Sequence, residues 1–494
     1  MSTLKKLASQ TLTYGVPNIL GRFINVLLLP IYTFYLSSIA EYGIVTIIYT
    51  LIAFLSVLYT HGMETAFFNA TRKAQNISAP FSNAFWSVLG VGSILTIAGI
   101  AISPQLAHLN HYAEQSHLFV LMFLILFLDA LSSIPFALLR KQNKAKKYVM
   151  IRSAGILINV LFNLLFIPVA SLAYKHGLIS INPSEHFVSL IFIANLIASS
   201  CIFIFLGPTL FPLLTKPSAN IWKPMLRYAW PLIIVGFAGI INETLDRLML
   251  KHMLPQAIAD TQVGIYSAFY KISLVITLFI QSFRYAAEPF FFNHADQNNP
   301  QPMYAKVLDY FVWICGFILL LTLLFTPWIA SILIRDKSYF NDPIGLQIVP
   351  ILLLANLFLG MVYNLSIWYK LSNQTLLGSI VSILGACITI VLNIIFIPHY
   401  GIMGAAYATL GAYLGMTLIS FLMGKYYYPV PYSYIKLSLI ILVLSSLVLL
   451  QTSQGYHMGT LISASLCYAF LFWWYEKPHR WIQQIRNKRV QKSN

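Results

Sequence analysis

The hexapeptide Asn163-Leu-Leu-Phe-Ile-Pro168 returns later in the chain as Asn393-Ile-Ile-Phe-Ile-Pro398. Further matching pairs occur in the same order along the two halves: Tyr14-x-x-Pro17 and Tyr228-x-x-Pro231, Gly43-Ile44 and Gly264-Ile265, Glu64-Thr-Ala-Phe-Phe68 and Glu288-Pro-Phe-Phe-Phe292, Arg140 and Lys370, and Gly155 and Gly385. Chance similarity between apolar stretches would not keep so many pairs in one order. The sequence therefore predicts an internal repeat that covers most of the chain.

The amino-acid composition requires lipid as the solvent. Of the 494 residues, 58% are hydrophobic and only 9% are charged, which is too few charges for a water-facing fold of this length. Apolar stretches of about 18 to 25 residues recur, and each is long enough to cross a hydrocarbon core of about 30 Å as a helix. A barrel would instead alternate apolar and polar residues. We therefore predict an all-α membrane protein with about 14 transmembrane helices.

The repeat divides these helices into two homologous lobes of six. The expected spans cover residues 12–34, 42–66, 81–103, 116–139, 148–168, 186–207, 229–251, 264–288, 309–334, 346–369, 376–398, 402–424, 433–451 and 456–475. The predicted domains are the N-terminal lobe, the C-terminal lobe, two additional transmembrane helices and a basic tail: residues 1–218, 219–428, 429–476 and 477–494. Because six is even, both lobes have one orientation, related by a pseudo-twofold axis along the membrane normal.

The basic residues define the topology. The chain has 31 Lys and Arg against 14 Asp and Glu, a net charge of +17. They gather in alternate loops and at both ends, as in the run from Arg140 to Lys147, whereas the intervening loops hold few: Lys175, Lys251, Arg335 and Lys337. The positive-inside rule then predicts a multi-pass protein of the bacterial cytoplasmic (inner) membrane with both termini in the cytoplasm. Topology explains the positive charge, so we expect no nucleic-acid partner.

Nothing in the sequence predicts an enzyme or a metal centre. The four cysteines lie inside predicted spans without metal-ligand spacing, so neither a disulfide framework nor a metal site is expected. No predicted outer loop exceeds about 20 residues, which leaves no room for a catalytic domain between spans. We expect no cofactor.

Several segments resemble the polysaccharide transporter family of the multidrug, oligosaccharidyl-lipid and polysaccharide exporter superfamily, which includes O-antigen and capsule flippases. The resemblance rests on Glu41-Tyr-Gly-Ile44, on Asp246-Arg-Leu248 followed by Val263-Gly-Ile-Tyr-Ser267, on Leu139-Arg-Lys-Gln-Asn-Lys144, and on Asn393 to Pro398 continuing through Tyr400-Gly-Ile-Met-Gly-Ala-Ala406. It spans about residues 10–425. The lipid II flippase branch usually carries several arginines in its first helix, where this chain has Arg22 alone.

The resemblance implies a function and a set of partners. It implies a flippase that moves a short oligosaccharide on undecaprenyl diphosphate from the cytoplasmic to the outer leaflet by alternating access, for O-antigen, capsule or exopolysaccharide synthesis. The implied partners are this polyprenyl-diphosphate-linked sugar, membrane lipid, and a polysaccharide polymerase with its chain-length machinery. The resemblance does not name the sugar.

Charged residues inside predicted spans are the candidate site. Each costs about 2.5–3.5 kcal/mol at the bilayer centre, so each is a functional hypothesis. A diphosphate needs cationic donors that replace its hydration, and guanidinium groups match phosphate oxygens. The predicted diphosphate-binding residues are Arg22, Lys271, Arg247, Arg152 and Arg284. Arg22 and Lys271 are the strongest, because no acid lies one turn away on their own helices.

The acidic residues have two interpretations. Asp129, Glu64, Glu243, Asp246 and Glu288 are predicted to take part in ion coupling or a gate. Glu243 with Arg247, and Glu288 with Arg284, have the i, i+4 spacing of same-helix pairs, so structural pairing is the alternative. Asp129 lies in the middle of a span and either binds H⁺ or Na⁺ or pairs with Arg22 or Arg152 across helices.

Two other functions compete with the flippase. A multidrug or organic cation antiporter of the same superfamily would have the same fold, but it should favour an acidic cavity. A membrane-embedded polysaccharide polymerase or glycosyltransferase would also act on polyprenyl-linked sugars, but it normally needs a large outer loop.

Overall fold

The computed structural model describes residues 21, 26–72, 76–180, 182–294, 299–372, 374–455 and 457–476. Within these ranges the regular elements are all helical, and no strand occurs in them, which confirms the predicted all-α fold. Arg22, most of the first predicted span and the predicted tail of residues 477–494 lie outside the described residues.

The helices of the first half are α2 (Leu29–Tyr35), α3 (Ile39–Thr60), α4 (Met63–Ala70), α5 (Ser78–Ala101), α6 (Ser103–Leu109), α7 (Ser116–Lys141), α8 (Ala145–Leu164), α9 (Ala170–Lys175) and α10 (Phe187–Leu210). Those of the second half are α11 (Ala219–Met253), α12 (Gln256–His294), α13 (Gln301–Leu333), α14 (Ile344–Leu365), α15 (Ile367–Leu371), α16 (Thr375–Tyr427), α17 (Tyr434–Gln454) and α18 (Met458–Glu476). Short turns of other helix types are η1 (Ala113–Gln115), η2 (Leu165–Val169), η3 (Pro183–His186), η4 (Phe211–Leu213) and η5 (Lys337–Phe340).

The helix lengths agree with the predicted spans. Among the described residues, 11 helices are long and apolar enough to cross a membrane. One of them, α16, has 53 residues and contains two predicted spans, with Gly401 at φ 56° and ψ −130° breaking the helix between them. The shorter apolar helix α18 supplies the last span. The described residues therefore account for every predicted span except the first, of which they include only residues 21 and 26–34.

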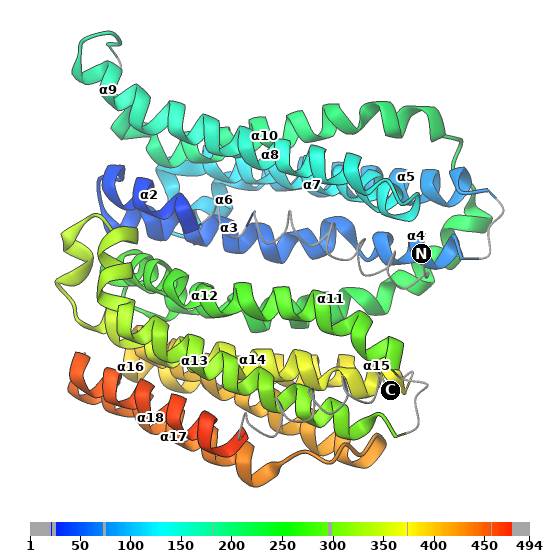
Figure 1. The fold of residues 1–494 in the computed structure, drawn as a ribbon. Helices are drawn as coiled ribbons and strands as arrows, with labels where there is room; N and C mark the ends of the chain where they lie inside the picture. The colour runs from blue at the N-terminus through cyan, green and yellow to red at the C-terminus, as the bar shows by residue number, and fades with distance from the viewer. Residues whose placement is uncertain are drawn as a thin grey trace, which may run out of the picture.

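The helices form two groups. In the first, α7 packs against α5, α8 and α10, and in the second, α14 packs against α12, α13 and α16. Figure 1 shows α5, α7, α8 and α10 in its upper half and α13 to α18 in its lower half, with α3, α11 and α12 between them. Helices α17 and α18 pack on α13 and α14. The two-lobe architecture is present, while the exact boundaries at residues 218 and 428 stay predictions.

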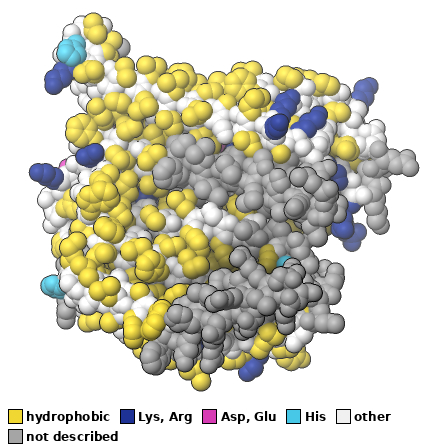
Figure 2. Space-filling view, viewed as in Figure 1, with side chains coloured by type: hydrophobic (Ala, Val, Ile, Leu, Met, Phe, Trp, Pro, Cys, Tyr) yellow, Lys and Arg dark blue, Asp and Glu magenta, His cyan; other side chains and the backbone are white. Residues whose placement is uncertain are grey.

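The described surface suits a bilayer. Hydrophobic side chains cover most of the described part of the face in Figure 2, and Lys and Arg side chains gather mainly toward the ends of the bundle. Large apolar residues are exposed along the helices, such as Ile97 on α5, Leu161 on α8 and Leu442 on α17. In water such surface would be unfavourable, and in lipid it is the expected exterior. The chain is therefore a multi-pass membrane protein.

Two glycines related by the repeat bring the lobes into backbone contact. Helix α3 of the first lobe packs along α12 and α11 of the second. A Cβ atom added to Gly43 would lie 2.0 Å from the carbonyl oxygen of Asp260, and one added to Gly264 would lie 2.3 Å from that of Ile39. Only glycine allows so close an approach. The contact lies where α3 and α12 begin. The charge pattern predicts that this end of the bundle faces outward, and we call it the outer end.

A buried cluster joins the lobes at the same end. The Nζ atom of Lys251 lies 2.7 Å from Oδ2 of Asp260, and the hydroxyl of Tyr112 donates to Oδ1 of Asp260 at 2.5 Å. Lys251 Nζ also lies 4.2 Å from the centre of the Tyr112 ring. The side chain of Lys251 is 1% exposed. Lys251, which was counted above with the outer loops, is therefore a buried residue of α11, which continues to Met253.

Removing the Tyr112 hydroxyl should loosen the outer end. Burial, and then the Asp260 charge, raise the pKa of Tyr112 far above its ordinary value, so the phenol remains a hydrogen-bond donor at physiological pH. A hydrogen bond to a charged group contributes about 1.5–3 kcal/mol. We expect Tyr112→Phe to shift the population toward a wider outer end by about tenfold or more. Spin labels at the exposed positions Leu109 and Ile258 would report this as a larger fraction of long distances.

The control for this prediction is Tyr174→Phe, which removes a hydroxyl from an exposed ring on α9. The labels require a background in which the four native cysteines are replaced. An unchanged distance distribution in Tyr112→Phe would show that this hydrogen bond does not hold the outer end closed.

Candidate substrate cavity

A cavity of about 930 Å³ lies between the two lobes. Its walls come from α2, α3, α7, α8 and α10 of the first lobe and from α11, α12, α14, α15 and α16 of the second. Sites for small molecules usually measure about 300–1,000 Å³, so this cavity is at the large end of that range. It is the main candidate for a binding site in the described part of the chain.

The cavity brings together most of the predicted cations. Lys271 and Arg284 reach it from α12, Arg247 from α11 and Arg152 from α8. Arg22 lies outside the described residues. Four of the five predicted diphosphate-binding residues therefore line one cavity, although they come from three helices in both lobes.

Each of these four cations lies over an aromatic ring. Distances from the charged group to the ring centre are 5.4 Å for Lys271 over Tyr42, 5.1 Å for Arg284 over Tyr363, 4.5 Å for Arg247 over Tyr270 and 5.6 Å for Arg152 over Phe136. All lie within the range of cation–π attraction, about 6 Å. The three tyrosines line the cavity themselves.

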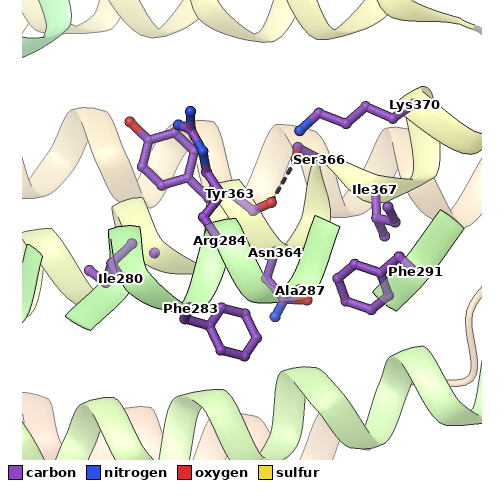
Figure 3. A pocket seen from close by; sticks show the side chains of 11 residues that line it. Ile280, Phe283, Arg284, Ala287, Phe291, Tyr363, Asn364, Ser366, Ile367 and Lys370 are labelled. Atoms are coloured by element: carbon purple, nitrogen blue, oxygen red, sulfur yellow. Dashed lines mark hydrogen bonds between the residues drawn. The ribbon is translucent and has the colours of Figure 1, made fainter. Parts of the chain in front are cut away.

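Figure 3 shows the part of this wall around Arg284, where the guanidinium lies beside the ring of Tyr363. The Ser366 hydroxyl donates to the backbone carbonyl of Tyr363 at 2.6 Å. The small pocket that these side chains enclose with Lys370 has a volume of about 10 Å³. This is about the space of a single water molecule, so the pocket is too small for a ligand and only adjoins the large cavity.

Arg247 is tied into the wall by an acid. Its Nη1 lies 2.9 Å from Oδ1 of Asp246 and donates to the backbone carbonyl of Glu243 at 2.9 Å. The hydroxyl of Tyr266 donates to the other oxygen of Asp246 at 2.6 Å. Asp246 is 4% exposed and does not line the cavity. Asp246 therefore forms an ion pair with Arg247 within α11. Glu243 lines the cavity.

Asp129 reaches the cavity from α7. Its carboxylate is exposed to the cavity and accepts a hydrogen bond from the Ser199 hydroxyl of α10 at 2.7 Å. Arg152 lines the same side of the cavity, but the described residues show no ion pair between Arg152 and Asp129 within 4.0 Å. Asp129 and Glu243 are the carboxylates that the structure places at the cavity among the predicted acids whose side chains it describes.

The other predicted acids lie elsewhere. Oε1 of Glu64 lies 2.7 Å from Nη2 of Arg140, so Glu64 joins α4 to α7 within the first lobe, away from the cavity lining. The side chain of Glu288 lies outside the described part of the chain. The structure therefore does not bring Glu64 to the cavity, and the role predicted for Glu288 stays a prediction.

The sequence analysis missed most of the cavity wall. Eight tyrosines line the cavity, and no phenylalanine or tryptophan does so among the described residues: Tyr32, Tyr42, Tyr49, Tyr270, Tyr285, Tyr363, Tyr369 and Tyr413. Amide side chains accompany them: Asn159, Asn195, Asn242, Asn356 and Gln281. These groups give ring faces together with donors and acceptors, which suits a ligand with many hydroxyl groups. The sequence has 29 tyrosines, and nothing in their spacing marks the ones that face inward.

Some of these polar groups are held in place by the second lobe. The amide of Asn242 on α11 donates to the carbonyl of Ser382 at 3.0 Å and accepts from the hydroxyl of Thr389 at 2.9 Å. The Tyr413 hydroxyl donates to the Asn242 backbone carbonyl at 3.0 Å. These bonds connect α11 to α16, so this part of the wall is a fixed surface.

The fold and the cavity together define a multi-pass membrane protein of the transporter type, with two helical lobes about one central cavity. The sequence matches the family described as polysaccharide biosynthesis protein over residues 7–294. Since this match covers more than half of the chain, the protein belongs to that family, and the resemblance stated above is confirmed. No curated protein sequence matches the chain.

Solved structures share the fold. The lipid II flippase MurJ in an inward closed conformation is similar with a TM-score of 0.69 and 15% identity, over 93% of this chain and 98% of that one. An inward-facing multidrug resistance MATE family transporter of the MOP superfamily gives 0.60 and 16%, over 89% and 95%. A MOP superfamily transporter from Pyrococcus furiosus gives 0.59 and 15%, over 89% and 99%. At these identities the likeness concerns the fold alone.

Proposed function

We propose that this protein is a flippase that carries an oligosaccharide linked to a polyprenyl diphosphate from the cytoplasmic to the outer leaflet of the bacterial cytoplasmic membrane. One observation carries the proposal: the cavity between the lobes is lined by Arg152, Arg247, Lys271 and Arg284, against the carboxylates of Asp129 and Glu243. An excess of cations in a partly dehydrated cavity favours an anionic ligand. The family, whose description is polysaccharide biosynthesis, supports the same cargo.

The proposed division of labour follows from the chemistry of the wall. Lys271 and Arg284 bind the diphosphate, since ammonium and guanidinium groups replace its lost hydration. The tyrosines and amides contact the sugar. The polyprenyl tail remains in the lipid during the crossing, because a long apolar chain gains nothing from entering a polar cavity.

The membrane potential favours the proposed direction. Moving one elementary charge through 100 mV is worth about 2.3 kcal/mol, and the cargo carries about two negative charges outward from a negative interior. Coupling to an ion is therefore not required. Asp129 is the carboxylate to which we assign any coupling to H⁺ or Na⁺, because it is exposed in the cavity.

The two competing functions predict other sites. A cation antiporter should present an acidic cavity, whereas cations exceed carboxylates in the described lining here. For the Pyrococcus furiosus transporter, the reverse polarity of the binding pocket was itself taken to suggest a different function. A polymerase or glycosyltransferase normally needs a large outer loop. In our proposal such an enzyme is a separate partner, which joins the sugar units that this protein delivers for O-antigen, capsule or exopolysaccharide synthesis.

A cell experiment tests the function directly. We expect cells without this protein to accumulate lipid-linked sugar units in the cytoplasmic leaflet, where an added membrane-impermeant glycosidase cannot reach them in spheroplasts. Restoring the gene should make the units accessible. If unpolymerised units instead accumulate in the outer leaflet, the protein is a polymerase, and the flippase proposal fails.

A further inference from the structure

The first-lobe side of the cavity carries a group of polar side chains that differs from the second-lobe side. It consists of one carboxylate, one guanidinium, two amides and one hydroxyl, which lie on α7, α8 and α10: Asp129, Arg152, Asn159, Asn195 and Ser199. Figure 1 shows these three helices together in its upper half. One acid and one base leave the group without excess charge, whereas the other cations of the described lining belong to the second lobe.

The spacing along the helices explains why these side chains meet. Asn195 and Ser199 are four residues apart, and Arg152 and Asn159 are seven apart, so each pair lies on one face of its helix. Helix α10 packs against both α7 and α8. The hydrogen bond from the Ser199 hydroxyl to Oδ1 of Asp129, at 2.7 Å, joins α10 to α7. The group is therefore a surface that three packed helices of one lobe build together.

The carboxylate of Asp129 has more acceptor capacity than the protein uses. It is exposed to the cavity, and among the described residues Ser199 is its hydrogen-bond partner. A carboxylate accepts at about four lone-pair positions on its two oxygens. Two neighbouring hydroxyl groups of a sugar ring are suited to donate to such a group, and hydrogen bonds to a charged acceptor are short and strong.

Amide and aromatic groups complete this surface. An asparagine offers two donors and one acceptor, which suits hydroxyl groups because each of them both donates and accepts. Asn195 donates to the Tyr49 hydroxyl at 3.4 Å, and the centre of the Tyr49 ring lies 5.1 Å from that of Phe192. The Arg152 guanidinium lies over the ring of Phe136. Contacts with the first lobe thus hold the groups that face the cavity.

We propose that this group is the sugar subsite of the cavity, in which Asp129 accepts hydrogen bonds from two adjacent hydroxyl groups of the cargo's sugar. Asn159 and Asn195 bind further hydroxyl groups. The inference rests on the proposed function, because it takes the diphosphate to lie at Lys271 and Arg284 on the second-lobe side. It also gives Asp129 a task in a transporter whose energetics do not require ion coupling.

The test compares two probes on the full chain purified in detergent. One is the lipid-linked sugar unit extracted from cells that lack this protein, and the other is undecaprenyl diphosphate without a sugar. We expect Asp129→Asn to weaken binding of the sugar-linked probe about tenfold, which corresponds to about 1.4 kcal/mol, and to change binding of the sugar-free probe less than about twofold. The reason is that an amide has one acceptor oxygen and no charge. Microscale thermophoresis measures both affinities.

A second variant keeps the test decisive if Asp129→Asn does not fold. Asn195→Ala should weaken binding of the sugar-linked probe about threefold or more, with the same selectivity, since it removes hydrogen bonds to the sugar alone. Arg284→Gln should instead weaken both probes to a similar extent, because both carry the diphosphate. The matched control is Glu185→Gln, which removes a carboxylate from an exposed position of the same lobe, outside the cavity lining. Its affinities should stay within about twofold of the wild type.

The outcomes separate this inference from the proposed function. A loss in Asp129→Asn that is confined to the sugar-linked probe supports the sugar subsite. An equal loss for both probes, or wild-type binding of both, would overturn it and leave the flippase intact. Wild-type affinities that depend equally on Na⁺ or pH for both probes, and lose this dependence in Asp129→Asn, would assign the residue to ion coupling and also overturn the subsite. Wild-type binding of both probes in the double variant Arg284→Gln/Lys271→Gln would contradict the proposed function itself.

Discussion

Arg284→Gln and Lys271→Gln should each lower the rate of flipping of a polyprenyl-diphosphate-linked sugar by at least about tenfold in proteoliposomes, and the double variant by about a hundredfold. A hydrogen bond to a charged group contributes about 1.5–3 kcal/mol, and 1.36 kcal/mol corresponds to a factor of ten in rate. Both residues line the cavity from α12. The measurement follows a labelled lipid-linked sugar that starts in a known leaflet of the vesicle, and it records how fast the sugar becomes accessible to, or protected from, a membrane-impermeant reagent.

Lys175→Gln is the control for this experiment, since it removes one positive charge from an exposed position on α9, outside the cavity lining. Glutamine is uncharged, shorter and has fewer donors, so the expected loss measures the contribution of the charged hydrogen bonds that each cation makes. Unchanged flipping in the double variant would contradict the cationic cavity, and the proposal that the cargo is a diphosphate would lose its main support.

Asp246→Leu should cause the largest loss of stability among the variants considered. Asp246 is 4% exposed, and its two oxygens accept from Arg247 and Tyr266. Removing one partner of a buried ion pair typically costs about 3–5 kcal/mol, because the remaining charge is left uncompensated. We expect a clear drop in the thermal unfolding temperature of the protein in detergent.

The control is Glu243→Gln. It removes a negative charge one turn earlier on the same helix, at a side chain that is exposed to the cavity. Its unfolding temperature should change little. The double variant Asp246→Leu/Arg247→Leu should recover part of the loss, since it removes both charges together. An unfolding temperature for Asp246→Leu equal to that of the wild type would show that the pair with Arg247 does not stabilise the fold.

The sequence allowed the architecture to be predicted because its signals are redundant. Hydrophobic length, the distribution of positive charge and the repeat all lead to the same set of spans. The repeat also singled out Gly43 and Gly264, and the structure shows that each faces the backbone of the opposite lobe. A glycine that occurs at the same position in both halves of the repeat thus indicated a close backbone contact between the lobes.

The cavity could be predicted only in part, because a nearly all-apolar helix does not reveal which face turns inward. Lys271 and Arg152 were recognised since a charge inside a span is conspicuous. Asp246 was grouped with the gate acids, yet its orientation depends on Tyr266 of a neighbouring helix. Lys251 was counted with the outer loops because it is the last residue of its predicted span, whereas the helix continues to Met253. The cavity tyrosines gave no signal at all.

The cluster at the outer end has a consequence for the work that each transport cycle must do. Lys251 and Asp260 both belong to the second lobe, and only Tyr112 comes from the first. When the lobes part there, one phenol leaves a carboxylate whose ammonium partner stays with it, so no lone charge is created. Breaking that bond requires about 1.5–3 kcal/mol. The electrical driving force on a doubly charged cargo, about 4–5 kcal/mol at 100 mV, exceeds this amount without any chemical fuel.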